Sequence, residues 1–262
     1  MKPLLLTFDV EEFDWLIDGV RPLPPADQIT ITVEGLRLLI PVLQNNRARA
    51  TFFVTGTFAE SRGDLLAELA DSGHEIGVHG LEHGDDYASL DPGEATKRLL
   101  RAREIVEGAS GQTAFGLRTP RLRKCPAAVV RDAGFVYDAS PHPTWVPGRY
   151  FGLLLSRKPW QVESITMIPI SVLPVLRLPV SWQWFQIAGR GLGVAALRPA
   201  AVFAPYLHLY FHPWEAIDLS SVGIATPVTR RTGPAFLKAM TAILTRTAGW
   251  TETTTVIDFI RG

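Results

Sequence analysis

The run Pro3-Leu-Leu-Leu-Thr-Phe-Asp-Val-Glu-Glu12 joins an apolar segment directly to a cluster of carboxylates. Its apolar half predicts a buried β-strand. Successive side chains of a strand point to opposite faces, so Asp9 and Glu11 share one face if the strand continues through them. The first strand of the chain is therefore expected to deliver acidic side chains to one edge of a sheet.

Short runs of this kind alternate with longer helical patterns along the rest of the chain. Strands are predicted at 4–9, 50–55, 75–79, 114–118, 135–138, 165–170, 206–212 and 254–260. Helices are predicted at 33–44, 64–72, 93–107, 127–133, 193–201 and 234–247. The repeated βα pattern favours an α/β fold with a parallel sheet. Because 262 residues fit one α/β barrel, residues 1–262 are expected to form a single domain.

Polar residues stand at the carboxyl ends of six predicted strands, the edge where the loops of a parallel barrel build an active site. They are Asp9, Thr55, His79, Arg118, Asp138 and His212. Convergence of this kind favours a catalytic site over chance placement.

The pair in His79-Gly-Leu-Glu-His83 has the spacing that places two imidazoles on one face of a helical turn. A carboxylate from the first strand, Asp9 or Glu11, would complete a set of two histidines and one acid. Such a set leaves a position for water and is typical of hydrolytic zinc-type centres. Non-haem iron oxygenases use the same ligands, although a βα scaffold weakens that alternative. For Glu12 the alternative is an acid in the first turn of a helix.

Arginines follow the fourth predicted strand in Gly116-Leu-Arg-Thr-Pro-Arg121. Arg118 leaves the strand end beside the expected carboxylates, where charge pairing would hold a catalytic acid ionised and orient it. Arg121 and Arg123 lie beyond Pro120 and are interpreted as a solvated helix start. The alternative for these two is contact with an anionic part of the substrate.

Near the end of the chain, His208, Tyr210 and His212 share one face of the predicted strand in Tyr206-Leu-His-Leu-Tyr-Phe-His-Pro-Trp-Glu215. His212 stands at the strand end, and Pro213 stops the hydrogen-bonding ladder directly after it. His212 is therefore the candidate general acid. His208 lies one layer deeper and is expected to be a buried histidine that is hydrogen-bonded within the core.

The composition excludes several classes of protein. Lysine and arginine together number 26, as do aspartate and glutamate, so there is no electrostatic case for nucleic-acid binding. Cys125 is the only cysteine, which rules out an intramolecular disulfide and fits a reducing compartment. The apolar run at the start is too short for a signal peptide or a membrane span, so a cytoplasmic location is expected.

Residues 165–205 are unusually apolar and include Trp182-Gln-Trp-Phe185. The favoured interpretation is a buried strand and a core-facing helix. The alternative is an aromatic surface with basic flanks that makes peripheral contact with the inner membrane and receives a lipid-linked sugar. Trp145 and Trp214 are further candidates for stacking on a sugar ring.

Five motifs occur in the order seen in the polysaccharide deacetylases related to the chitooligosaccharide deacetylases of nodulation, and the chain resembles that family over most of its length. They are Thr7-Phe-Asp9, His79-Gly-Leu-Glu-His83, Arg118-Thr-Pro120, Tyr137-Asp-Ala-Ser140 and Phe211-His-Pro-Trp-Glu215. The resemblance implies a distorted (β/α)7 barrel and hydrolysis of N-acetyl groups on amino sugars. It also implies a divalent metal, with zinc the first expectation and cobalt, nickel or manganese as alternatives.

The resemblance also implies roles for individual residues. Asp9 matches the catalytic base, His79 and His83 the metal ligands, Arg118 the partner of the base and His212 the general acid. The common family pattern has adjacent aspartates after Thr-Phe, whereas this chain has Val10 and then Glu11, as in a branch that begins Thr-Phe-Asp-Val-Glu and ends His-Pro-Trp-Glu. Glu11 is accordingly the expected third ligand, with Asp9 or Glu12 as alternatives. Asp138 is carried over as a further catalytic residue on a looser match.

Taken with the residues themselves, the resemblance predicts a metal-dependent carbohydrate N-deacetylase, a hydrolase of linear amide bonds. Its substrate would be an amino sugar of a polysaccharide or of a lipid-linked glycan precursor. In this mechanism Asp9 takes a proton from the attacking water, His212 protonates the departing amine, and a backbone amide near Thr55-Gly56 stabilises the oxyanion. The alternatives are a deformylase of a lipid-linked amino sugar and a sugar-binding relative without catalysis.

Overall fold

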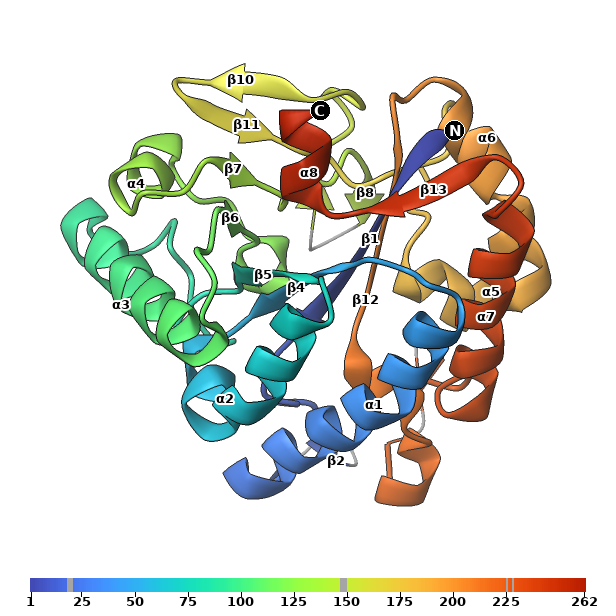
Figure 1. Ribbon diagram of the computed structural model, residues 1–262, viewed down its shortest axis with the longest axis horizontal. Coiled ribbons are helices and arrows are strands. Elements are labelled where there is room, and N and C mark those ends of the chain that lie inside the picture. Colours follow the sequence, from blue (N-terminus) through green and yellow to red (C-terminus); the bar gives the residue numbers. More distant parts are fainter. Residues whose placement is uncertain (18–20, 147–149, 225, 228) are drawn as a thin grey trace.

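The computed structural model describes residues 1–17, 21–146, 150–224, 226–227 and 229–262. A single mixed sheet forms its centre, with helices around the outside (Figure 1). Along this sheet the order of the paired strands is β10-β11-β7-β6-β5-β4-β1-β12, and β13 pairs with β1 in addition. Each pairing from β11 to β12 along this path is parallel, and within this sheet the β10–β11 hairpin is the only antiparallel pairing in the described part.

The strands of the parallel path run as follows: β1 Lys2–Val10, β4 Thr51–Val54, β5 Glu75–Val78, β6 Gly116–Leu117, β7 Tyr137–Asp138, β11 Ile165–Met167 and β12 Leu207–Phe211. The remaining strands of the main sheet are β10 Trp160–Val162 and β13 Thr251–Thr254. Two small hairpins lie outside it. One pairs β2 Leu16–Ile17 with β3 Arg21–Pro22, and the other pairs β8 Trp145–Val146 with β9 Tyr150–Phe151.

The helices are α1 Pro25–Asn45, α2 Gly56–Asp71, α3 Pro92–Ser110, α4 Ala127–Asp132, α5 Trp182–Ala195, α6 Leu197–Val202, α7 Pro234–Thr247 and α8 Val256–Arg261. Three 3₁₀ turns are described as well: η1 Pro120–Leu122, η2 Pro213–Ala216 and η3 Leu219–Val222. Within the described residues, no helix combines the length and the apolarity that a bilayer span requires.

The seven strands of the parallel path agree with the expected (β/α)7 barrel, and β13 adds an eighth parallel strand beside β1. The barrel is distorted at one place. Strands β11 and β12, the two ends of the parallel path, do not pair with each other in the described residues. An irregular segment crosses this gap: the Ile168 amide donates to the Asp138 carbonyl at 2.9 Å and the Ser171 amide to the His208 carbonyl at 3.0 Å. The Ile168 bond extends the pairing of β11 with β7, and the Ser171 bond reaches β12, so no strand ladder closes the barrel between β11 and β12 in the described residues.

A small apolar cluster fills the inside of this barrel, apart from the larger core between strands and helices. Phe53 on β4 meets Tyr137 on β7 edge to face, with ring centroids 6.3 Å apart, although these two strands are not neighbours in the sheet. Val256 and Ile257 of α8 join the same cluster. The amino-terminal end of the barrel is thereby closed by the last helix.

The predicted strand at 254–260 is wrong. Strand β13 ends at Thr254, and α8 begins at Val256. Thr255 caps this helix, because its side chain accepts a hydrogen bond from the Asp258 amide, and Asp258 lies in the first turn where the helix dipole favours an acid. The threonine-rich sequence favours a strand, but the Thr-x-x-Asp cap ends it.

Other element boundaries also move. The predicted helix at 193–201 is two helices, since α5 begins at Trp182 and α6 covers Leu197–Val202. The predicted helix at 64–72 begins eight residues earlier, at Gly56, where Thr55 is its cap and accepts from the Phe58 amide at 3.2 Å. A cap that directly follows a strand moves the start of the helix to the strand end.

Candidate metal centre

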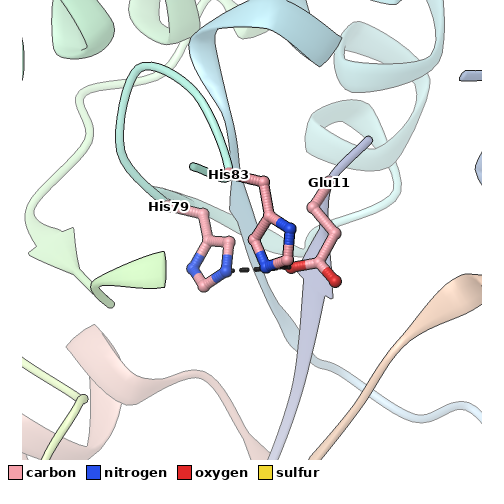
Figure 2. Close-up of side chains that lie close together, drawn as sticks. All are labelled: Glu11, His79 and His83. Atoms are coloured by element: carbon pink, nitrogen blue, oxygen red, sulfur yellow. Dashed lines mark hydrogen bonds and ion pairs between the residues drawn. The ribbon is translucent and has the colours of Figure 1, made fainter. Parts of the chain in front are cut away.

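Glu11, His79 and His83 form a buried cluster at the carboxyl edge of the sheet. The Oε2 atom of Glu11 lies 3.1 Å from Nε2 of His79 and 3.1 Å from Nε2 of His83. Figure 2 shows both imidazoles directed at this one carboxylate. All three potential ligand atoms lie within 4.8 Å of one another, so they can share one ion.

The ends of two barrel strands with β4 between them supply Glu11 and His79. Glu11 is the first residue after β1, and its carbonyl accepts a hydrogen bond from the Thr32 hydroxyl of α1 at 2.8 Å. His79 is the first residue after β5, and its amide donates to the Val54 carbonyl of β4 at 2.8 Å. The backbones of both residues are therefore fixed by adjacent elements.

The predicted helical turn at 79–83 is wrong, although it brings the two histidines to the same place. These residues form a loop that turns at Gly80, whose φ is +88°, a conformation that favours glycine. The Leu81 amide donates to the Tyr87 hydroxyl at 2.9 Å, which holds the loop over the end of β5. The two imidazoles therefore meet because the chain turns at Gly80, and not because they share one face of a helix.

Each histidine has a second partner on its other ring nitrogen. Nδ1 of His79 lies 2.9 Å from the Arg118 carbonyl and therefore carries the proton, which leaves Nε2 as the free lone pair. Nδ1 of His83 lies 3.1 Å from the Asp14 carboxylate. Carbonyl and carboxylate partners of this kind orient metal-binding imidazoles. The sequence analysis missed Asp14, although it lies in the same acidic segment as Glu11.

Electrostatics show that the centre is built around one charged carboxylate. Burial raises the pKa of Glu11, but His83, His79 and His212 outweigh it and leave that pKa far below its ordinary value. Burial lowers the pKa of His83, and the carboxylates of Glu11 and Asp14 raise it by more. Two imidazole nitrogens and an ionised carboxylate are a donor set that zinc, cobalt, nickel and manganese accept. The residues present therefore fit a divalent cation.

Asp9 has a different role from Glu11, because it pairs with a fully buried arginine. Arg118 donates from Nη1 to Asp9 Oδ1 at 2.7 Å and to the Thr7 hydroxyl at 2.8 Å. Its Nη2 donates to His208 Nε2 at 2.7 Å, and the Phe53 ring lies 4.4 Å below its guanidinium. Five donors in a fixed fork allow this many directed contacts at once.

His208 is the buried, hydrogen-bonded core histidine that the sequence predicts, and it holds Arg118. Its Nδ1 donates to the Pro169 carbonyl at 3.1 Å, so its Nε2 is the acceptor for the guanidinium. Burial and the positive charge of Arg118 keep its pKa well below the ordinary histidine value. A neutral His208 thus fixes the arginine that orients Asp9.

His212 is held on its other side by Glu215. The Glu215 carboxylate accepts from the His212 amide at 2.9 Å and lies 3.3 Å from its Nδ1. Burial lowers the pKa of His212, and Glu215 together with Glu11 raises it by more. Nε2 is then the atom that His212 turns toward the centre, 3.9 Å from Glu11 Oε1. The i, i+3 spacing of a capping box is the sequence signal that points to Glu215.

Two tryptophans form the wall beside His212. Trp214 stacks on the imidazole with centroids 4.6 Å apart, and its indole N–H donates to Glu11 Oε1 at 3.3 Å. It is 1% exposed, so the prediction that it stacks on a sugar ring is wrong. Trp182 meets the same imidazole edge on at 5.1 Å.

Asp9, Glu11, His79, His83 and His212 all line one cavity of about 410 Å³. Asp138 does not line it; this aspartate accepts from the Ser140 amide at 2.7 Å and borders a neighbouring cavity. Burial raises the pKa of Asp138. The structure therefore brings together every predicted site residue except Asp138, with Arg118 behind the cavity wall.

Thr55, Gly56 and Glu12 are engaged elsewhere. The Thr55 amide donates to the Val10 carbonyl and the Gly56 amide to the Gly80 carbonyl, each at 3.0 Å. The predicted oxyanion contribution from these amides is therefore wrong, since both already have acceptors. Glu12 accepts from the Thr55 hydroxyl at 2.5 Å and lies outside any helix.

The aromatic segment after residue 181 is packed against the protein. Trp182 and Phe185 are each 4% exposed, and Trp184 is partly buried. This burial agrees with the favoured interpretation for Trp182 and Phe185 alone. Other large apolar side chains of residues 165–205 are exposed, among them Val175, Leu176, Leu192, Val202 and Phe203. The tryptophans do not form an exposed aromatic surface.

The structure therefore combines a distorted parallel barrel with two histidines, a carboxylate and flanking acid–base candidates at its strand ends. The family model described as polysaccharide deacetylase matches residues 2–137. The chain belongs to the polysaccharide deacetylase family.

Among curated relatives, the chitooligosaccharide deacetylase of Bradyrhizobium sp. (strain ANU 289) is 29% identical over 128 residues, which cover 49% of this chain and 47% of the relative. The chain spans less than half the length of the first curated relatives that it matches. A Mycobacterium smegmatis protein described as a polysaccharide deacetylase has a crystal structure with a TM-score of 0.71 and 18% identity, covering 99% of this chain and 88% of that one.

A likeness at such low identity shows the fold alone. The crystal structure of Puue allantoinase also matches, with a TM-score of 0.68 and 17% identity over 99% of this chain and 89% of that one. This fold therefore carries more than one activity, and the site has to identify the reaction.

Proposed function

We propose that the protein is a metal-dependent N-deacetylase that removes acetyl groups from an amino sugar of a glycan. One observation carries the proposal: a single cavity joins the Glu11, His79 and His83 cluster to Asp9 and His212. These are a candidate cation centre, a candidate base and a candidate acid, which together are what hydrolysis of an amide requires. The parallel barrel favours this function over an iron oxygenase.

Glu11, His79 and His83 would hold the cation. When bound, a divalent ion supplies Lewis-acid polarisation of the acetamide carbonyl and makes water more acidic. Zinc is the metal that we propose, with cobalt, nickel and manganese as alternatives for this donor set.

Asp9 accepts the proton of the attacking water in this mechanism. Arg118 faces its Oδ1 atom, so Oδ2 is the oxygen available for that proton. His212 then gives a proton from Nε2 to the departing amine, while Glu215 holds Nδ1. His208 and Glu215 act as positioning residues. His208 contacts Arg118, which is the partner of Asp9. Glu215 contacts Nδ1 of His212, the ring nitrogen opposite the one that gives the proton.

The test is Asp9→Asn, compared with the exposed Asp71→Asn on α2. Asp9→Asn should lower acetate release from amino-sugar oligomers by about 100-fold or more, because a general base is lost. Metal content, measured on the purified proteins, should stay equal in both variants, since Asp9 is not a ligand. Equal acetate release from the two variants would contradict the assignment of the base.

Removal of a formyl group uses the same catalytic groups and is the alternative that we retain. Measuring acetate and formate release from matched acyl sugars separates the two. A non-catalytic sugar-binding role is the second alternative, and it predicts glycan binding with no acyl release by the wild-type protein. A lipid-linked substrate, peripheral membrane contact and a cytoplasmic location stay predictions of the sequence.

A further inference from the structure

A second cavity, of about 630 Å³, lies beside the cavity that holds the candidate metal centre. The two share Arg121 and Leu122, which form part of the wall of each. The two cavities are therefore adjacent along these two residues. Asp138, which the sequence analysis placed among the catalytic residues, belongs to this second cavity.

Three cationic side chains from one short segment line the second cavity: Arg121, Arg123 and Lys124. Two acidic side chains, Asp86 and Asp138, line it as well. Asp86 lies 3.5 Å from Nη1 of Arg123, and both side chains are more than a third exposed. Within the part of the chain that the structure describes, no carboxylate forms an ion pair with the exposed Lys124.

Asp138 is the second acid of this cavity, and Ser140 holds its carboxylate in place. Its carboxylate is buried and accepts from both the amide and the hydroxyl of Ser140. Burial raises the pKa of Asp138, while the hydrogen bonds from Ser140 and the charge of Arg118 act in the opposite direction. Arg121 pairs with Asp14 and Arg123 with Asp86, so Lys124 is the cation of this segment that has no carboxylate partner among the described residues.

The backbone of the cationic segment is held in an unfavourable conformation. Arg121 and Leu122 have φ values of +55° and +53°, a region that residues with a side chain rarely adopt. Hydrogen bonds from the Leu122 amide to the Thr119 carbonyl at 3.0 Å and from the Arg123 amide to the Pro120 carbonyl at 3.2 Å maintain the turn. Strain of this kind concentrates at binding and catalytic sites.

We infer that this second cavity is an anion subsite, in which Arg123 and Lys124 bind a phosphate or carboxylate group of the substrate while its acetamide lies at the metal centre. The inference rests on the proposed function and adds the chemical class of the substrate to it. Guanidinium and ammonium groups bind both anions through charge-assisted hydrogen bonds. Trp160 and Phe151 on the same cavity wall offer apolar contact to the rest of the ligand.

Binding measurements test the anion subsite independently of catalytic turnover. We would load the Asp9→Asn protein with metal and titrate it with N-acetylglucosamine 1-phosphate by calorimetry. Three forms of this protein are compared. The first has no further change, the second carries Arg123→Gln plus Lys124→Gln, and the third carries the control pair Arg37→Gln plus Lys97→Gln. Both control residues are exposed, on α1 and α3, and the control removes the same charge. Lys124→Gln alone, which alters an exposed side chain, guards against a folding defect.

The subsite double variant should bind the sugar phosphate at least about tenfold more weakly than the control pair, with a smaller loss in Lys124→Gln alone. Any direct contact of the phosphate with the metal is the same in all forms and cancels in this ratio. N-acetylmuramic acid, titrated in the same way, reports whether a carboxylate is preferred. Equal affinities of the subsite and control variants, within about twofold, for both anionic ligands would overturn the inference.

Turnover distinguishes the two proposals from each other. If the wild-type protein releases acetate and yet the subsite variants bind both anions normally, only the subsite is refuted. If the wild-type protein releases no acyl group from any amino sugar, the proposed function fails, and the difference in anion binding still decides the subsite.

Discussion

At the scale of single residues, two acids separated by one position take up different chemistry. Asp9 lies in β1 and meets Arg118, whereas Glu11 lies just beyond the strand and meets two imidazoles. An arginine stabilises an ionised carboxylate and leaves it able to accept a proton, while two neutral imidazoles beside a carboxylate make a set of metal ligands. Neighbouring side chains therefore determine which acid suits the proposed base and which the proposed ligand.

A buried histidine far from the metal centre should make stability depend on pH. His74 is 4% exposed and accepts the Ala50 amide at Nδ1. Burial, with a contribution from Arg49, lowers its pKa from 6.5 to about 4. Between these values the unfolded chain binds the proton and the folded protein does not, so the free energy of unfolding should fall by up to about 3 kcal/mol as the pH drops from 6.5 to 4.

Urea unfolding at a series of pH values measures this dependence. His74→Asn keeps a hydrogen-bond acceptor and removes the titration, so its stability should change less across the same pH interval. Identical pH profiles of the wild-type protein and the variant would show that other groups cause the acid sensitivity.

At the scale of secondary-structure elements, the site depends on how closely α1 lies against η2. The Cβ atom of an alanine at Gly35 would stand 2.1 Å from the Pro213 carbonyl oxygen. Only glycine allows this approach, and η2 is the turn that carries Trp214 and Glu215 directly after His212. The first helix thus positions the acid end of the site, although it contributes no side chain to the cavity.

Gly35→Ala should therefore destabilise the protein by about 1–3 kcal/mol, because backbone atoms have to move. The matched control is Gly108→Ala on α3, where an added Cβ meets no atom within 4 Å. That variant should gain about 0.5–1 kcal/mol from its higher helix propensity. Urea unfolding of the two variants gives the comparison, and a Gly35→Ala protein as stable as the wild type would rule out the close packing.

At the scale of the whole molecule, the candidate ligands come from two strand ends and the loop after β5. Glu11 follows β1, and His79 and His83 follow β5 across the intervening strand β4. These segments lie together only in the folded chain. A bound cation should therefore stabilise the folded state and not the unfolded one.

Adding zinc to chelator-treated protein should accordingly raise the unfolding temperature. At a free concentration about 100 times the dissociation constant, the gain is about 2.7 kcal/mol, which corresponds to several degrees for a chain of this length. Glu11→Gln should lose most of this shift, whereas Glu34→Gln, at an exposed position on α1, should keep it. Equal shifts in both variants, measured by calorimetry, would place the metal elsewhere.

The sequence determined much of this protein by itself. The alternating β and α patterns are local in the chain, so the sequence shows where each strand ends. The polar residues at those ends predicted the edge of the sheet at which Asp9, His79 and His212 meet. Two predictions of secondary structure were wrong. At Thr255 a helix cap outweighed the strand propensity of the threonines, and at Gly80 a glycine turn stands where a helical turn was predicted.

The folded barrel sets the contacts between residues far apart in the chain. It assigned Asp9 to Arg118 and Glu11 to the histidines, added Asp14, His208 and Glu215 behind them, and moved Asp138 to the neighbouring cavity. The physical reason is that hydrogen bonds and charge pairs depend on distance in space. Local periodicity indicates which edge of the sheet a side chain reaches, but the packing of the whole barrel sets which partner it meets there.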